Sequence, residues 1–214
     1  MKSIQTHINE RLKLNRDRVQ HYEYFPETKK ELRDIIENLI DKKGNNVDLN
    51  VIDTSKITDM SKLFDDYFLN DFCGDVSQWN VSNVKEMNSM FFYCKHFNCD
   101  LSHWDVSQVE DMGFMFGGCT SFTGDGLKNW NVSKVKNMDA MFAKCKNLDC
   151  DLSHWDVSQV TNMQHMFYDS NFNNDISSWK IKNNTTTSAA YAPTSEMFSK
   201  SPLENNPPAW YKNI

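Results

Sequence analysis

The chain has 214 residues, of which 39% are hydrophobic and 13% are aromatic, and its formal net charge is −6. This composition fits one folded domain and excludes a disordered chain, because disordered segments are poor in aromatic residues. The negative charge excludes nucleic acid and anionic membrane surfaces as expected partners, since both require a basic face. No apolar run approaches the roughly 20 residues that span a bilayer, so we expect no membrane insertion.

The N-terminal part, residues 1–45, is expected to be a leader and a helical cap. Its first twenty residues predict either a docking peptide or a loosely packed capping helix, and they contain no apolar core typical of a secretory signal. The missing signal favours a cytoplasmic or phage-encoded protein over a cell-surface protein. The next stretch, TKKELRDIIENLIDKKG, predicts an amphipathic helix that begins with a Thr28–Glu31 capping box and stops at Gly44. Its expected apolar face consists of Leu32, Ile35, Ile36, Leu39 and Ile40.

Residues 46–198 are expected to form about six repeats of about 25 residues each. The string CDLSHWDVSQV occurs twice, starting at Cys99 and at Cys150, because these are two copies of one unit, two repeats apart. Each of the first four repeat tryptophans is followed by a methionine and then by a Met-Phe pair, and Trp179 is followed by the half-copy SEMF at 195–198. We expect the buried core to contain Trp79, Trp104, Trp130, Trp155, Trp179, Met90, Met115, Met141, Met166, Phe91, Phe116, Phe142 and Phe167.

Each unit predicts a short strand followed by a short helix. In LSHWDV, the equal parity of Trp104 and Val106 is typical of a strand with both side chains inward, and the whole pattern matches the skeleton of a leucine-rich repeat. The apolar residues from Val109 to Phe116 recur at i, i+3, i+6 and i+7, as on one face of a helix. A serine that could cap this helix precedes each apolar stripe, at Ser82, Ser107, Ser133 and Ser158, and only Ser107 has a glutamate, Glu110, three residues on.

One strand and one helix cannot bury their apolar faces alone, so neighbouring units must stack. We therefore expect an α/β fold, a short leucine-rich-repeat-like solenoid with a parallel sheet on one side and short helices on the other. The N-terminal helix would cap one end. Residues 199–214 would cap the other end with Pro207, Pro208, Trp210 and Tyr211 folded over the last repeat, and the segment NNTTTSAAYAPTS at 183–195 predicts a loop.

The sequence predicts no catalytic residue, no metal site and no cofactor. Cys94, Cys119 and Cys145 share one place in the repeat, and such recurring thiols are most simply small buried apolar groups. No C-x-x-C pair indicates a metal site. The two His-x-Asp pairs that flank Trp104 and Trp155 would point outward from strands about 10 Å apart, too far to share one metal ion.

The residues on either side of each tryptophan are expected to form an outward polar strip along the sheet. Solenoids commonly bind partners through such extended faces, although the strip could equally be a solvated surface. The candidate binding residues are Gln78, Asn80, His103, Asp105, Asn129, Asn131, His154, Asp156, Ser178 and Lys180.

The unit FNCDLSHWDVSQVEDMGFMF, residues 97–116, closely resembles the BspA-like leucine-rich repeat, also called the mycoplasma-lipoprotein repeat of unknown function. The string W-[DN]-V-S-x-V-x-x-M-x-x-M-F recurs four times, and the resemblance covers residues 50–198. Such repeats occur in bacterial surface proteins, protist proteins and viruses, and are associated with binding and adhesion. The resemblance implies a non-catalytic module that recognises a protein partner through its sheet face or an end. The alternatives are a structural subunit of a phage particle or surface assembly, and a surface adhesin if the protein is exported.

Overall fold

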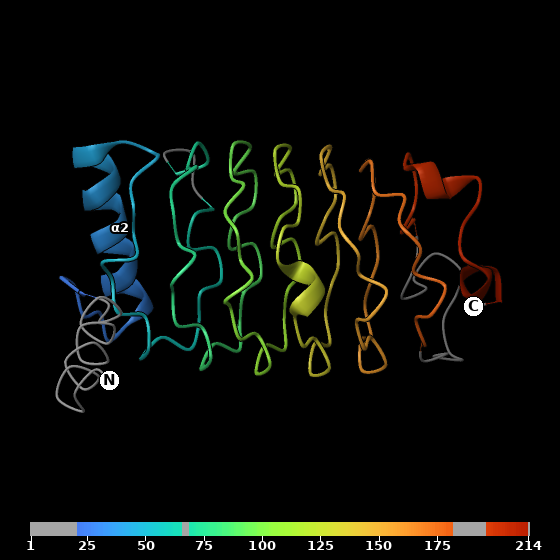
Figure 1. Cartoon of the computed structure of the whole chain (residues 1–214), viewed down its shortest axis with the longest axis horizontal. Coiled ribbons are helices and arrows are strands. Elements are labelled where there is room, and N and C mark those ends of the chain that lie inside the picture. The colour runs from blue at the N-terminus through green and yellow to red at the C-terminus, as the bar shows by residue number, and fades with distance from the viewer. Residues whose placement is uncertain (1–20, 66–68, 182–195, 214) are drawn as a thin grey trace, which may run out of the picture.

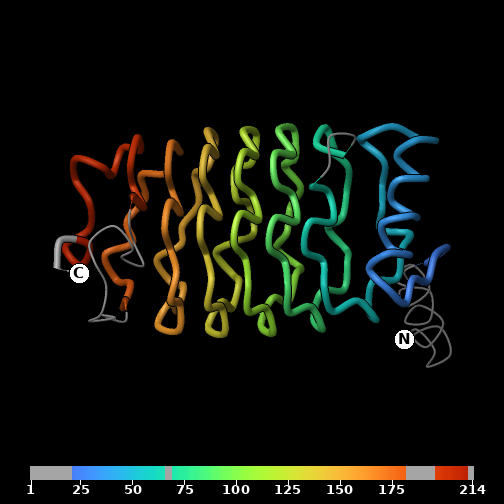
Figure 2. The backbone as a smooth tube through the Cα atoms, turned by 180° about the vertical axis from the view of Figure 1, so that it is seen from behind, coloured from blue at the N-terminus to red at the C-terminus, as the bar shows by residue number. Residues whose placement is uncertain are grey.

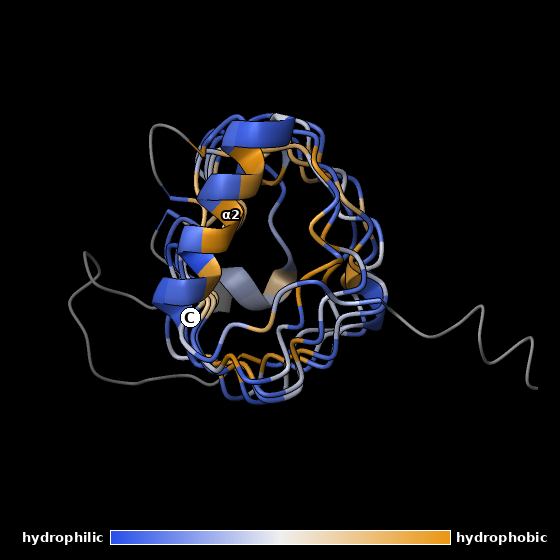
Figure 3. Cartoon of the chain, turned by 90° about the vertical axis from the view of Figure 1, so that its left-hand side faces the viewer, coloured by the Kyte–Doolittle hydropathy of each residue, from blue (hydrophilic) through white to orange (hydrophobic). Residues whose placement is uncertain are grey.

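The computed structural model describes residues 21–65, 69–181 and 196–213, and in this part the chain winds into flat coils that lie side by side along the long axis (Figures 1 and 2). Viewed down that axis, successive coils lie over one another (Figure 3). The N-terminal helix lies at one end of the row and the C-terminal residues at the other (Figure 1). The interpretations of the first twenty residues and of the loop at 183–195 concern residues outside the described part.

The expected parallel sheet and the expected repeat helices are wrong. In the described ranges the helices are α2 (Lys29–Lys43) and the short 3-10 helices η1 (Leu127–Asn129), η3 (Pro202–Glu204) and η4 (Ala209–Asn213). Within these same ranges, the parallel pairing between coils consists of isolated bridges, such as the one between Asp111 and Asn137. The α/β interpretation as a leucine-rich-repeat-like solenoid with a sheet and a row of short helices is therefore corrected.

Each coil is instead built from a series of β-turns. The backbone N–H of Trp104 donates to the carbonyl of Leu101 (3.1 Å), and that of Met115 donates to Met112 (3.2 Å). The first and last residues of such a turn point into the core, and the two middle residues point outward. Consecutive turns therefore place apolar residues three apart, which is the spacing that we interpreted as a helix.

Left-handed residues at the turns prevent the chain from continuing as a helix. Ten non-glycine residues of the described part have φ between 48° and 61°, including Phe114 and Ala140. Each costs about 1–2 kcal/mol relative to the right-handed conformation. Most of their N–H groups bond along the row of coils rather than within a helix: Phe114 donates to the carbonyl of Asp139 and Ala140 to that of Gln164, both at 2.7 Å.

The serines that we expected to cap helices lie in side-chain-stabilised turns instead. The backbone N–H of Ser107 donates to Oδ1 of Asp105 at 3.0 Å. Glu110, expected to complete a capping box, donates its own backbone N–H to the carbonyl of Lys85 at 2.8 Å. No helix follows these serines, and the same turn recurs at Ser82, Ser133 and Ser158.

The core consists of columns of identical side chains, one from each coil. The rings of Trp104 and Trp130 stack with their centroids 6.3 Å apart and their planes 2° apart. The indole N–H of Trp130 donates to the carbonyl of Leu101 in the preceding coil at 3.1 Å, so the buried indole is hydrogen-bonded. The thirteen side chains expected in the core are at most 4% exposed.

Both ends of the row of coils are covered. The expected amphipathic helix is confirmed as α2: Thr28 accepts a hydrogen bond from the Glu31 N–H, and Gly44 ends the helix with φ of 88°. Its buried side chains are Leu32, Ile36, Leu39 and Ile40, while Ile35 is partly buried. At the other end, Trp210 stacks on Trp179 with centroids 6.2 Å apart and donates its indole N–H to Ile176 at 2.8 Å. Trp210 thus takes the place of the next tryptophan in the column.

The left-handed turn residues lead to a stability prediction. Ser89 has φ of 54°, so replacing it by glycine should stabilise the folded protein. The relief of the left-handed strain exceeds the additional backbone entropy that a glycine loses on folding. We expect Ser89→Gly to raise the free energy of unfolding by about 0.5–1 kcal/mol in urea denaturation.

Two variants serve as controls for that experiment. Ser89→Val should lower the free energy of unfolding by about 1–2 kcal/mol, because a β-branched residue tolerates positive φ poorly. Ser121→Gly, at a turn residue outside the positive-φ set, should lower it by about 0.5–1 kcal/mol. Destabilisation by Ser89→Gly equal to that of Ser121→Gly would contradict the argument.

Candidate functional site

The ten residues of the predicted polar strip are all exposed, but they lie in or beside turns, with Asn129 in η1, rather than in a sheet. One of the two rows has a local structural role. The side chains of Asn80, Asp105, Asn131 and Asp156 each accept the backbone N–H of the serine two residues on. One side-chain oxygen of each of these residues is therefore already hydrogen-bonded within its own turn. The other row contains Gln78, His103, Asn129, His154 and Ser178, and its Ser178 donates to the carbonyl of Ser153.

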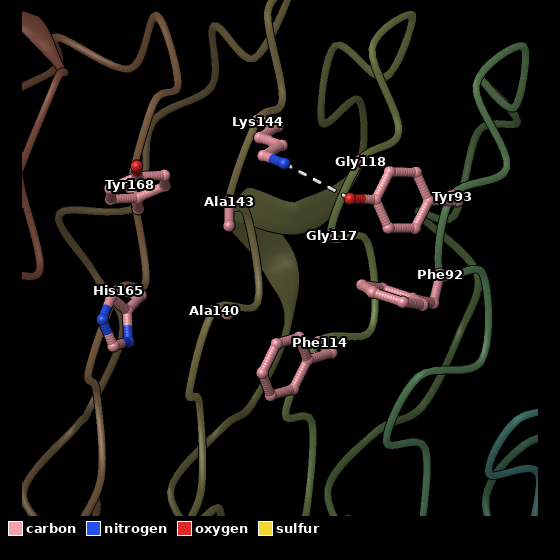
Figure 4. A pocket seen from close by; sticks show the side chains of 10 residues that line it. All are labelled: Phe92, Tyr93, Phe114, Gly117, Gly118, Ala140, Ala143, Lys144, His165 and Tyr168. Atoms are coloured by element: carbon pink, nitrogen blue, oxygen red, sulfur yellow. Dashed lines mark hydrogen bonds between the residues drawn. The ribbon is translucent and has the colours of Figure 1, made fainter.

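A different face carries an apolar groove formed by four consecutive coils (Figure 4). The groove has a volume of about 310 Å³. It follows the turns after each repeat methionine and phenylalanine, where the outward residues of other coils are mostly polar. None of the ten predicted binding residues lines it. Its lining residues are Phe92, Tyr93, Phe114, Gly117, Gly118, Ala140, Ala143, Lys144, His165 and Tyr168.

Two adjacent glycines allow the aromatic side chains of the previous coil to lie close to the backbone. A Cβ atom at Gly118 would lie 2.8 Å from the Tyr93 ring, and one at Gly117 would lie 3.2 Å from the Phe92 ring. Gly118 also has φ of 81°, which favours glycine. These glycines, with the small side chains of the following coil, form the floor of the groove.

Aromatic rings form the two sides of the groove. On one side, the Phe92 ring meets the Phe114 ring edge-on with centroids 5.7 Å apart, and meets the Tyr93 ring at 4.5 Å. On the other side, His165 and Tyr168 meet edge-on at 6.0 Å. Tyr93 and Phe114 are each 38% exposed, and they are two of the three exposed large hydrophobic residues of the described part. Exposed aromatic residues of this kind are typical of binding surfaces.

Lysine ammonium groups lie along one rim of the groove. Lys144 extends across Gly118 and donates to the Tyr93 hydroxyl at 3.3 Å, with its Nζ 5.7 Å from the ring centroid (Figure 4). Lys200 donates to the Tyr168 hydroxyl at 2.6 Å in the same way. The hydrogen bond to Tyr168 is the main cause that raises the pKa of Lys200. The rim therefore carries two positively charged ammonium groups, each hydrogen-bonded to a tyrosine hydroxyl.

A carboxylate–histidine cluster lies at the opposite side of the floor. Nδ1 of His165 is 3.6 Å from Oδ1 of Asp139, and its Nε2 is 3.7 Å from Oε2 of Glu196. Oδ1 of Asp139 is buried without a hydrogen bond. Burial raises the pKa of Asp139, and the neighbouring His165 opposes this shift.

Five of the six thiols are buried or partly buried, and Cys73 is exposed. All six cysteines are free, and burial of Cys99 and Cys150 raises the pKa of each thiol to about 12, so the nucleophilic thiolate is disfavoured. Cys94, Cys119 and Cys145 are buried, and Cys119 donates to the carbonyl of Phe91 at 3.0 Å. Across the described ranges, no three His, Cys, Asp or Glu side chains gather where they could hold a metal ion.

The groove was missed because the turns were interpreted as helices. A helix would have directed Phe92, Tyr93 and Phe114 to different parts of its surface. The available signal was a departure from the repeat: aromatic residues replace polar ones at outward positions, and the next units place Gly117 and Gly118 beside them.

Asp139 gives the site a testable pH dependence. A carboxyl whose folded pKa is raised stabilises the fold below its unfolded value of 3.8, and this contribution is lost as the pH rises through the folded value. Asp139→Asn removes that loss, so we expect the variant to gain stability relative to wild type as the pH rises from 4 to 7 (urea unfolding at several pH values). Asp105→Asn, at an exposed turn, is the control. A difference between wild type and Asp139→Asn that is constant with pH would contradict the assignment.

One family of known sequences matches most of the chain. The family described as Mycoplasma protein of unknown function, DUF285, matches residues 31–128 and 115–206. No curated protein and no solved structure matches the chain. No helix in the described ranges has the length and apolar character needed to cross a bilayer. The two matched ranges cover most of the sequence, and the chain therefore belongs to the DUF285 family of Mycoplasma proteins of unknown function.

Proposed function

We propose that this protein is a non-catalytic recognition module that binds a protein partner through the aromatic groove. The observation that carries the proposal is the cluster of rings in the groove, where Tyr93 and Phe114 are exposed and Phe92 is partly buried beside them. The resemblance of the repeat to BspA-like repeats, which are associated with binding and adhesion, supports the same class of function. The rigid columns of the core would hold the rings in place, which reduces the entropy lost on binding.

The covered ends favour recognition over permanent end-to-end assembly. A structural subunit that stacks on its neighbours should expose a large apolar patch at one end. In the described part, α2 covers the first coil and Trp210 covers the last. The exposed rings of Tyr93 and Phe114 lie instead on the side of the stack, whereas the exposed Phe25 precedes α2. A phage or surface assembly that joins through its ends has no comparable support here.

Capture from a lysate of the source organism tests the proposal. The baits are the wild-type chain, Phe114→Gly and the double variant His103→Ala/His154→Ala. Glycine suits the positive φ of Phe114, so Phe114→Gly removes the ring without straining the fold. We expect a partner, identified by mass spectrometry and then purified, to bind Phe114→Gly at least about tenfold more weakly, or ~1.4 kcal/mol.

The remaining variants separate the groove from other surfaces. The double histidine variant should keep wild-type affinity, since its residues lie on the predicted polar strip. Phe25→Ala, which removes an aromatic residue 65% exposed outside the groove, should also bind normally. A partner lost by the histidine variant and kept by Phe114→Gly would return recognition to the strip.

A further inference from the structure

The dimensions of the groove limit the kind of segment that it can hold. Its lining comes from four consecutive coils, so it extends over three coil spacings, or roughly 14 Å. A polyproline II segment rises about 3.1 Å per residue, so four or five residues would span the groove.

The backbone around the groove leaves little opportunity for strand addition. The N–H groups of Phe114, Gly118 and Ala140 already donate to carbonyls of the following coil at 2.7 Å each. A peptide that binds as an added strand needs free N–H and C=O groups at an edge. A segment that binds here must therefore use its side chains, as polyproline II segments do in aromatic-lined grooves.

The lining favours apolar ring contacts over a dense hydrogen-bond network. Its side-chain polar groups are the hydroxyls of Tyr93 and Tyr168, the ring of His165 and the ammonium of Lys144. Both hydroxyls already accept hydrogen bonds from lysines. A carbohydrate, which presents many hydroxyls, would leave most of them unpaired, whereas a pyrrolidine ring packs on aromatic rings without hydrogen bonds.

The charge at the rim adds a requirement for the occupant. Among the described residues, the Lys144 ammonium has a phenol oxygen as its partner and no carboxylate ion pair. The carboxylates next to the floor, Asp139 and Glu196, face His165 instead. A carboxylate on the bound segment could therefore form an ion pair with the Lys144 ammonium. A charge-assisted hydrogen bond of this kind is stronger than the bond to a neutral hydroxyl.

From these observations we infer that the groove binds an extended, proline-containing peptide segment that carries an acidic residue beside the Lys144 ammonium. The inference rests on the proposed protein-binding function and names the chemistry of the partner. The prolines would lie against Phe114 and Phe92, and the acidic side chain would point to the rim.

A selection from a random heptapeptide library displayed on phage tests the inference, with the full chain as bait. Parallel selections use Phe114→Gly and Lys144→Met, which keeps an aliphatic side chain but removes the charge. On the wild-type chain we expect enriched peptides that contain both proline and Asp or Glu. On Lys144→Met the proline enrichment should persist and the acidic enrichment should disappear, and on Phe114→Gly neither should occur.

Calorimetric titration of the enriched peptide, acetylated and amidated, then measures the pairing. Replacing its acidic residue by the amide should weaken binding to wild type about tenfold and leave binding to Lys144→Met unchanged. Enriched peptides that need Phe114 but lack proline or acid would overturn the inference and leave the protein-binding function standing. Enrichment that is unchanged on Phe114→Gly, or binding only to an array of glycans, would overturn both.

Discussion

The backbone hydrogen bonds between coils are the interaction on which the rest of this structure depends. At most of the left-handed turn residues the N–H leaves its own coil and meets a carbonyl of the next one, as Phe114 does with Asp139. Several such bonds per coil offset the conformational cost of positive φ at residues other than glycine. Without a neighbouring coil the same turns would have no partner, so a single repeat cannot be stable alone.

The side-chain columns follow from this backbone arrangement. Because each coil repeats the turns of the previous one, identical residues lie over one another, and the tryptophan rings become nearly parallel. The indole N–H bonds connect each tryptophan to the preceding coil. Where the repeats end, the last tryptophan of the column, Trp179, needs another ring to cover it. Trp210 provides it by stacking on Trp179, although it lies outside the repeat.

The aromatic groove is possible because the core constrains the outward residues of each turn less than the inward ones. The core fixes the first and last residue of each turn, and the middle residues vary except where a positive φ or a close neighbour limits them, as at Gly118. In most coils they are polar, whereas around Gly118 they are rings and small residues that together make a hollow. Recognition would thus be added to the repeat without changing its packing, which is how a rigid repeat scaffold can acquire a specific surface.

The sequence by itself determined the repeat, its buried residues, the helix α2 and the exposure of the residues beside each tryptophan, because burial follows from apolar spacing. It could not determine whether the i, i+3 spacing from Val109 to Phe116 meant a helix or consecutive turns, since both place such residues on one side. Only the tertiary structure decided this, because the hydrogen bonds that select the left-handed turns join residues about 25 positions apart. The tertiary structure also decided the groove, because its residues are far apart in the sequence: Tyr93 and Lys144 meet across an intervening coil.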